Sequence, residues 1–155
     1  MFSDILKYTL YETEQAKISL QKEIQLVRDY VEVFQYRVDP ARADIKLNIR
    51  GDADGLQIAP MLLIPFIENS FKHGLQGVAG AVQIRIDLEV SSSGLDFRLS
   101  NTTGTGAPLD LEKRKGIGIE NTRQRLELLY PAKHTLNIQK EQGTFMVNLK
   151  LELKE

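Results

Sequence analysis

Hydrophobic residues recur at steps of three and four between residues 19 and 38, which is the spacing of one face of an α-helix. This apolar stripe consists of Leu20, Ile24, Val27, Val31, Phe34 and Val38. Charged residues, among them Glu23, fall off the stripe and are expected on the opposite face. Ser19 precedes the stripe as a candidate helix cap, and Asp39-Pro40 ends it, because the residue before a proline avoids the helical conformation. We expect a helix over residues 19–38, after the tail of another helix within residues 5–11.

Further along the chain, apolar residues recur at every second position, which is typical of half-buried strands. Runs with this spacing cover residues 45–49, 82–90, 95–99, 136–138 and 145–153. The last four runs form two expected hairpins, and helical spacing returns within residues 60–75 and 119–129. Hairpins with helices between them favour an α+β fold, in which helices cover one face of an antiparallel or mixed sheet in two layers.

Apolar residues show no regular spacing within residues 101–118. This segment includes Gly104, Gly106, Gly116 and Gly118. A loop of this length in a compact domain is usually functional or mobile, so we expect this segment to move. The only candidate domain boundary lies near Asp39, which would divide the chain into a helical arm and a compact domain.

Composition and charge narrow the class of protein. The 155 residues are 42% hydrophobic and 26% charged, which fits one globular domain with an apolar core and excludes a largely disordered chain. The absence of cysteine excludes disulfides, thiolate metal sites and cysteine nucleophiles. A net charge of −1 provides no basic field for nucleic acid or an anionic membrane. The longest apolar run, Ile58 to Ile67, is too short to cross a bilayer.

The helix expected within residues 60–75 carries a concentrated set of polar side chains, namely Glu68, Asn69, Lys72 and His73. A solvated helix surface accounts for the charged members. The asparagine is harder to account for, because Asn is a poor helix former, whereas its amide oxygen is a hard ligand suited to Mg²⁺. An ordinary surface and a ligand site both remain open as interpretations.

Gly116-Ile117-Gly118 opens the next helix, and Lys113-Arg114-Lys115 precedes it. Glycines before a helix let backbone N–H groups approach a phosphate, and a basic run attracts one. Simple turn chemistry accounts for such glycines at least as well, because no Walker pattern or G-x-G-x-x-G after a strand is present. Phosphate binding therefore stays one of two interpretations.

Taken together, these motifs resemble the sensor histidine kinases. Residues 65–74, Pro-Phe-Ile-Glu-Asn-Ser-Phe-Lys-His-Gly, resemble the N-box of that family. Residues 116–126, Gly-Ile-Gly-Ile-Glu-Asn-Thr-Arg-Gln-Arg-Leu, resemble the second glycine box of its LytS-type branch. The resemblance implies the GHKL (Bergerat-type) ATP-binding fold, with a helical arm over residues 1–39 and an ATP-binding catalytic domain over residues 40–155.

The resemblance also implies roles for individual residues of the N-box. Asn69 would bind the Mg²⁺ that bridges the ATP phosphates. Glu68 would polarise the attacking imidazole or a water molecule, and Lys72 and His73 would contact the phosphates or the lid. Catalysis would then consist of positioning and charge neutralisation, as phosphoryl transfer generally requires.

In the glycine box, Gly116 and Gly118 would let an ATP lid formed by residues 102–115 close over the phosphates. Asn121 and Arg125 would lie near the nucleotide in the same arrangement. All of these assignments are implied by the resemblance alone.

Asn101 stands where most of the superfamily has an aspartate that accepts the adenine amino proton. Its amide oxygen still accepts such a bond, although without the charge. A charged hydrogen bond exceeds a neutral one by enough to change affinity about tenfold. We expect Asn101 to bind adenine more weakly than an aspartate would.

The family's phosphoacceptor histidine lies in a motif upstream of the arm, and no such motif precedes Leu6. The resemblance therefore implies a piece of a longer bacterial membrane protein, with this domain on the cytoplasmic side. Its expected partners are ATP, an upstream phosphoacceptor helix, a response regulator and a second copy in a homodimer, with no nucleic acid and no membrane contact. The piece alone should bind nucleotide without autophosphorylating.

Two other functions remain open. A degenerate domain that has lost nucleotide could serve only in dimerisation or docking, which Asn101 would explain. Another GHKL ATPase, of the chaperone, topoisomerase or mismatch-repair type, would use Glu68 to activate water and would release ADP and phosphate.

Overall fold

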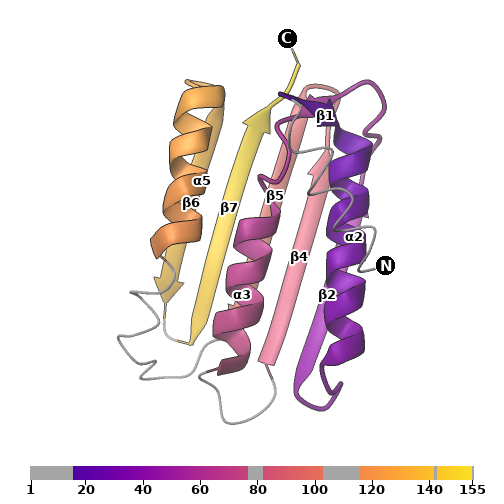
Figure 1. Cartoon of the computed structure of the whole chain (residues 1–155), viewed down its shortest axis with the longest axis vertical. Coiled ribbons are helices and arrows are strands. Elements are labelled where there is room, and N and C mark those ends of the chain that lie inside the picture. Colours follow the sequence, from indigo (N-terminus) through magenta and orange to yellow (C-terminus); the bar gives the residue numbers. More distant parts are fainter. Residues whose placement is uncertain (1–15, 77–81, 103–115, 142, 155) are drawn as a thin grey trace.

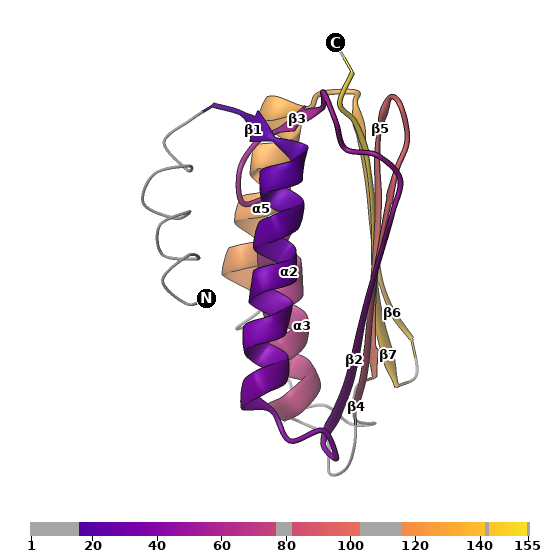
Figure 2. The same ribbon diagram turned by 90° about the vertical axis from the view of Figure 1, so that its right-hand side faces the viewer.

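The computed structural model describes residues 16–76, 82–102, 116–141 and 143–154. In chain order its elements are β1 (Ile18–Ser19), α2 (Leu20–Arg37), β2 (Ala43–Arg50), β3 (Gln57–Ile58), α3 (Ile64–Gln76), β4 (Val82–Val90), β5 (Gly94–Thr102), α5 (Gly116–Leu129), β6 (His134–Glu141) and β7 (Thr144–Glu152). Figure 1 shows α2, α3 and α5 lying along the sheet, and Figure 2 shows all of them on one of its faces. This two-layer α+β arrangement confirms the fold expected from the spacing of apolar residues.

The main sheet has five strands in the order β2-β4-β5-β7-β6. β2 runs parallel to β4, and the other neighbours pair antiparallel, so the sheet is mixed. Both hairpins expected from the sequence are present, as β4–β5 and β6–β7. Alternate residues of each central strand are buried beneath the helices, which explains the strict alternation of their sequences.

The helix expected over residues 19–38 is α2. The Ser19 hydroxyl accepts a hydrogen bond of 3.3 Å from the backbone N–H of Lys22, as a helix cap does, and Val38 ends the helix in an extended conformation. One expectation for this helix is wrong: Glu23 lies in its buried face, with 0% of the residue exposed. The reason is that its carboxylate finds buried backbone donors, described below.

Aromatic side chains join the two layers and the helices to one another. Phe66 of α3 packs over Phe97 of β5, with ring centroids 6.1 Å apart. Phe34 of α2 stacks on Phe71 of α3 at 4.1 Å, and Tyr30 stacks on the same ring at 5.7 Å. Aromatic residues of the arm therefore pack within this domain. The division of the chain at residues 39 and 40 nevertheless stays a prediction.

Several element boundaries differ from the expectation. α3 begins at Ile64, because residues 59–63 take a separate irregular path, and α5 already begins at Gly116. A short antiparallel pair, β1 with β3, was not apparent from the sequence because each strand has two residues. The expected helix within residues 5–11 and most of the expected lid, from residue 103 on, lie outside the described residues. Within the described part, no helix is both long and apolar enough to span a membrane.

Candidate functional site

The C-terminal half of α3, the end of β5 and the start of α5 lie at the same end of the molecule (Figure 1). Most of the polar residues singled out in the sequence lie on these three segments. Because α3 and α5 are also in contact, the segments form one continuous region. The fold thus brings together two motifs, the N-box and the glycine box, that are far apart in the sequence.

On α3, the apolar side faces the sheet and the polar side remains accessible. Ile67 and Phe71 are fully buried, whereas Asn69 is partly exposed. The Glu68 carboxylate forms an ion pair of 3.0 Å with the ammonium group of Lys72, one helical turn further on. Both side chains remain about half exposed, so this pair adds little stability and leaves both charges available to a ligand. The side chain of His73 lies outside the described residues.

Tyr30 of α2 lies beside this polar side of α3. Burial, and secondly the negative charge of Glu68, raise the pKa of the Tyr30 hydroxyl to about 12. The hydroxyl is therefore a neutral donor at physiological pH. Sequence analysis did not assign Tyr30 to the site, because its position on an amphipathic helix indicated packing only.

Asn101 occupies the last core-facing position of β5 and is 2% exposed. Its side-chain oxygen accepts a hydrogen bond of 2.8 Å from the hydroxyl of Ser70, which is itself fully buried. Its amide nitrogen donates to the backbone carbonyl of Thr102 at 3.2 Å. A carbonyl oxygen accepts two hydrogen bonds, so one acceptor position of Asn101 is left for a ligand. Ser70 directly follows Asn69, and this bond therefore ties the strand end to the N-box helix.

The glycines of the second motif lie in the first turn of α5. A Cβ atom added at Gly118 would meet no atom of the described residues within 4 Å, so packing does not require glycine there. The carbonyl of Gly118 accepts a hydrogen bond of 2.9 Å from the hydroxyl of Thr122, which is buried. Asn121 is exposed on the same turn. The bond from Thr122 lies within α5, and N–H groups at the start of a helix of this kind can receive an anion.

Arg125 has a different environment from the other predicted residues. It lies about 10 Å further along α5 than Gly118, at about 1.5 Å per residue. Its guanidinium group donates hydrogen bonds to the backbone carbonyls of Pro60 at 2.8 Å and Met61 at 3.3 Å. A role of Arg125 near the nucleotide therefore stays a prediction, and its observed contacts are with the backbone.

Comparisons with known proteins bear on this arrangement. A family model described as "Histidine kinase" matches residues 1–42. The sensor histidine kinase YesM of Bacillus subtilis is 26% identical over 143 residues, which are 84% of this chain and 23% of that protein. The sensor histidine kinase YpdA of Escherichia coli is 29% identical over 140 residues, 83% of this chain and 24% of that protein. This chain spans about a quarter of the length of these relatives.

Solved structures agree with the sequence relationship. The catalytic domain of histidine kinase ThkA superposes with a TM-score of 0.56 at 10% identity, covering 89% of this chain and 95% of that one. The histidine kinase domain of a blue-light activated kinase from Erythrobacter litoralis gives 0.60 at 18% identity, covering 90% of this chain and 69% of that one. The chain is a relative of the sensor histidine kinases with the fold of their catalytic domain. The expected GHKL fold is thereby confirmed.

The resemblance predicts Mg²⁺ with ATP, and the residues present fit such an ion. Among the described residues there is no group of three or more His, Cys, Asp or Glu side chains placed to hold a metal. Mg²⁺ typically takes only one or two protein ligands when phosphate oxygens complete its shell. The amide oxygen of Asn69, on the accessible side of α3, is a suitable ligand.

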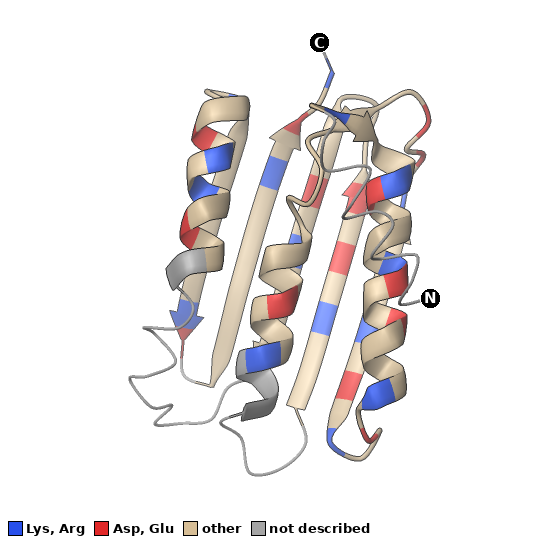
Figure 3. Cartoon of the chain, viewed as in Figure 1, with Lys and Arg blue, Asp and Glu red and all other residues tan. Residues whose placement is uncertain are grey.

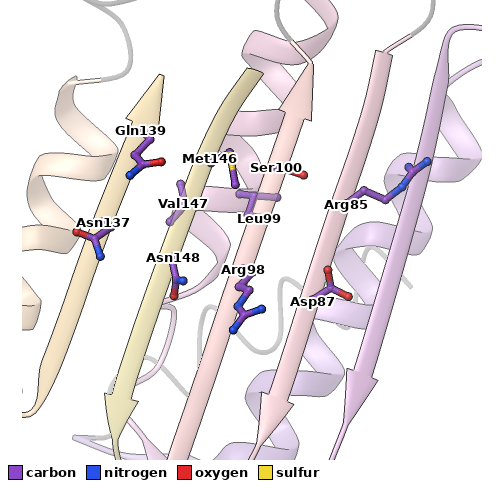
Figure 4. A pocket seen from close by; sticks show the side chains of 10 residues that line it. All are labelled: Arg85, Asp87, Arg98, Leu99, Ser100, Asn137, Gln139, Met146, Val147 and Asn148. Atoms are coloured by element: carbon purple, nitrogen blue, oxygen red, sulfur yellow. The ribbon is translucent and has the colours of Figure 1, made fainter. Parts of the chain in front are cut away.

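The face of the sheet opposite the helices carries a separate depression of about 300 Å³ (Figure 4). Asp87, Arg98 and Asn148 lie there in register on neighbouring strands. The lining contains none of the predicted site residues whose side chains are described. Figure 3 shows acidic and basic residues interspersed along the helices and strands, so neither sign of charge dominates the described surface. This depression is therefore separate from the predicted site residues on α3, β5 and α5.

Proposed function

We propose that this chain binds ATP with Mg²⁺ and acts as the catalytic domain of a sensor histidine kinase, transferring the γ-phosphoryl group to a histidine on an upstream helix. The observation that carries the proposal is the hydrogen bond between Ser70 and Asn101. It joins the strand end expected to bind adenine to the helix expected to bind Mg²⁺. One rigid unit can therefore fix both ends of a nucleotide.

Each residue of the N-box would have a separate role in phosphoryl transfer. When bound, Mg²⁺ would neutralise charge on the phosphates, and Asn69 would hold it. The Glu68 carboxylate would accept a hydrogen bond from the attacking imidazole and so orient it. Lys72 would leave its ion pair with Glu68 to contact a phosphate, which the exposure of both side chains permits. This division fits a reaction that depends on positioning and charge neutralisation.

The start of α5 would contribute backbone donors. Two glycines in its first turn leave room beside N–H groups whose helix dipole favours negative charge. Neither packing nor a left-handed conformation accounts for glycine at position 118. We infer that Gly116 and Gly118 are there so that phosphate can approach the backbone, with Asn121 alongside.

The relationship to sensor kinases supports a wider proposal for the protein. Its partners would be a phosphoacceptor helix, a response regulator and a second copy of the protein. The parent would be a bacterial membrane protein with this domain on its cytoplasmic side. The sensor-kinase relatives support the use of ATP and of a response regulator, and the other partners and the location are part of the proposal.

One observation favours a second function, a docking domain that no longer binds nucleotide. Both polar atoms of the Asn101 amide already bond within the chain, to Ser70 and Thr102. If adenine cannot reach the remaining acceptor position of this buried oxygen, the base has no buried partner here. Binding experiments separate the two functions directly.

Calorimetric titration of the 155-residue chain with ATP, with and without Mg²⁺, tests the proposal. Asn69→Ala should abolish the Mg²⁺-dependent part of the binding. Asn137→Ala, which changes an exposed asparagine on β6, is the matched control and should bind as the unchanged chain does. Absence of binding by the unchanged chain would favour the docking domain.

Phosphoryl transfer requires a supplied acceptor helix from a relative. Transfer of label from γ-labelled ATP to its histidine, lost in Asn69→Ala, would support the kinase activity. Steady release of phosphate without an acceptor would instead favour another GHKL ATPase.

A further inference from the structure

Residues Ala59–Leu63, which we name the strap, connect β3 to α3 without forming a helix or strand. Side chains from distant elements bind every backbone N–H group of the strap. The hydroxyl of Tyr130 accepts from Ala59 at 2.9 Å, and Pro60 has no N–H group. The N–H groups of the remaining three residues all donate to the carboxylate of Glu23. The strap is thus held by α2 and by the residue after α5, without support from a neighbouring strand.

The Glu23 carboxylate is the centre of this arrangement. One of its oxygens accepts from Met61 at 3.0 Å, and the other accepts from Leu62 at 3.1 Å and from Leu63 at 3.3 Å. Met61 has a φ of +63°, a left-handed conformation that residues other than glycine rarely adopt. Consecutive N–H groups around such a residue converge and form a nest for an anion. Glu23 supplies that anion from within the chain.

Arg125 holds the strap through its carbonyl groups. Its guanidinium group donates to the carbonyls of Pro60 and Met61, as described above. Two peptide groups of the strap, Pro60–Met61 and Met61–Leu62, therefore have the N–H end bonded to Glu23 on α2 and the C=O end bonded to Arg125 on α5. Both kinds of bond have one charged partner, and such bonds are generally stronger than neutral ones.

The strap ends where α3 begins, and α3 carries the N-box. Glu68 and Asn69 follow within about two turns of helix. A helix moves as a stiff unit, so a shift of its first turn reaches Asn69 with little loss. A displacement of about 1 Å at reacting groups can lower a rate by about a hundredfold, which makes the strap's position relevant to the chemistry.

We propose that Glu23 is a positioning residue for the nucleotide site: by binding the three strap N–H groups, it fixes the start of α3 and hence the place of Asn69. This inference rests on the proposed function. Through it, α2 sets the geometry of the N-box without touching the nucleotide. A change in the position of α2 would thereby reach the site directly.

The variant Glu23→Gln tests this, because it preserves the volume of the side chain. Glutamine has a single acceptor oxygen, and its NH₂ group would face the strap's own N–H donors. At least one buried N–H group would then lose its partner, and the strap would have to rearrange. Val90→Ala is the matched control, since it truncates a core residue at the end of β4 away from the site.

The experiment measures ATP binding in the presence of Mg²⁺ and the melting temperature for the unchanged chain and both variants. Glu23→Gln should weaken binding about tenfold or more, which is about 1.4 kcal/mol. Val90→Ala should lower the melting temperature while binding ATP as the unchanged chain does. Equal affinity of Glu23→Gln and the unchanged chain would overturn the inference.

Amide signals in ¹⁵N–¹H spectra provide a readout that needs no nucleotide. In Glu23→Gln the signals of Met61, Leu62 and Leu63 should shift, and those of Glu68 and Asn69 should shift with them. If only the strap signals move, Glu23 supports the strap without positioning the site, and the inference fails. If the unchanged chain binds no ATP, the proposed function fails, and these spectra still decide whether Glu23 positions α3.

Should Glu23→Gln not fold, Glu23→Asp replaces it. This variant keeps the carboxylate and shortens its reach by one methylene group. Binding between that of the unchanged chain and a tenfold loss, with the same α3 signals displaced, would support the inference. Unchanged α3 signals and affinity in Glu23→Asp, with displaced strap signals, would contradict it.

Discussion

The hydroxyl of Ser70 on α3 donates a hydrogen bond of 2.8 Å to the side-chain oxygen of Asn101 on β5, and both residues are buried. The bond connects the helical layer to the sheet next to the proposed nucleotide site. It also fixes the orientation of the Asn101 amide, whose nitrogen donates to Thr102. Because this amide carries no charge, it should accept a weaker hydrogen bond from adenine than a carboxylate would.

Asn101→Asp should tighten ATP binding about tenfold, because a carboxylate accepts a stronger hydrogen bond from the adenine amine. In the absence of nucleotide the same variant should lower the free energy of unfolding by about 1–3 kcal/mol, since the bond to the Thr102 carbonyl is lost. Calorimetry and urea denaturation measure the two effects. Asn137→Asp, at an exposed position, is the control for the added charge. Unchanged ATP affinity in Asn101→Asp would show that residue 101 does not contact adenine.

Gly118→Ala should have opposite effects on stability and on binding. Alanine favours the helix over glycine by about 1 kcal/mol, and the new methyl group meets no described atom within 4 Å, so the free energy of unfolding should rise. ATP affinity should fall, because the methyl group occupies the space proposed for a phosphate. Urea denaturation measures the expected rise in the free energy of unfolding, and ATP titration of the same preparation measures the expected loss of affinity. A stabilised variant with full affinity would rule out close phosphate approach at this turn.

Tyr130→Phe should lower the free energy of unfolding by about 1–3 kcal/mol, because the buried N–H group of Ala59 loses its acceptor. Tyr36→Phe is the matched control, since Tyr36 is 90% exposed and the same hydroxyl is removed there. Urea denaturation of both variants gives the comparison. Equal stabilities for the two would mean that the strap bond contributes nothing measurable.

Tyr30 should titrate with a pKa of about 12, above its ordinary value of 10.0. Because the folded-state pKa is the higher one, its contribution to stability is complete below about pH 10 and is lost as pH rises toward 12. The difference in ultraviolet absorbance between the unchanged chain and Tyr30→Phe follows this titration. Glu68→Gln should lower the pKa of Tyr30, because it removes the nearby negative charge. This decrease should be smaller than the increase that burial causes. A transition near pH 10 in this absorbance difference would contradict the burial of the Tyr30 hydroxyl.

The secondary structure was largely predictable because it depends on local spacing. Alternation in β4 and β5 and the stripe of α2 reflect which face meets the core, and each pattern is complete within one element. For the candidate site, Asn69 stood out as a poor helix former within its helix, whereas Asn101 was singled out only through the family resemblance. Their roles stay predictions, although the fold places both at one end of the molecule.

The strap and the contacts of Arg125 could not be predicted in this way. A charged residue on a helix is normally solvated, so Glu23 was placed on the exposed face. One signal pointed the other way, since Glu23 is spaced three residues after Leu20 and four before Val27, both on the stripe. That spacing is compatible with a buried position, but it does not indicate which groups the carboxylate binds.

The sequence alone therefore determined the elements, the fold class and the family resemblance, because these depend on periodicity and on motifs within short segments. Only the tertiary structure decided what Glu23, Tyr130 and Arg125 bind. Their partners lie 38 to 71 residues away along the chain, and those partners are backbone groups. Backbone N–H and C=O groups are the same at every residue, so no side-chain pattern marks which of them a buried acid or base will meet.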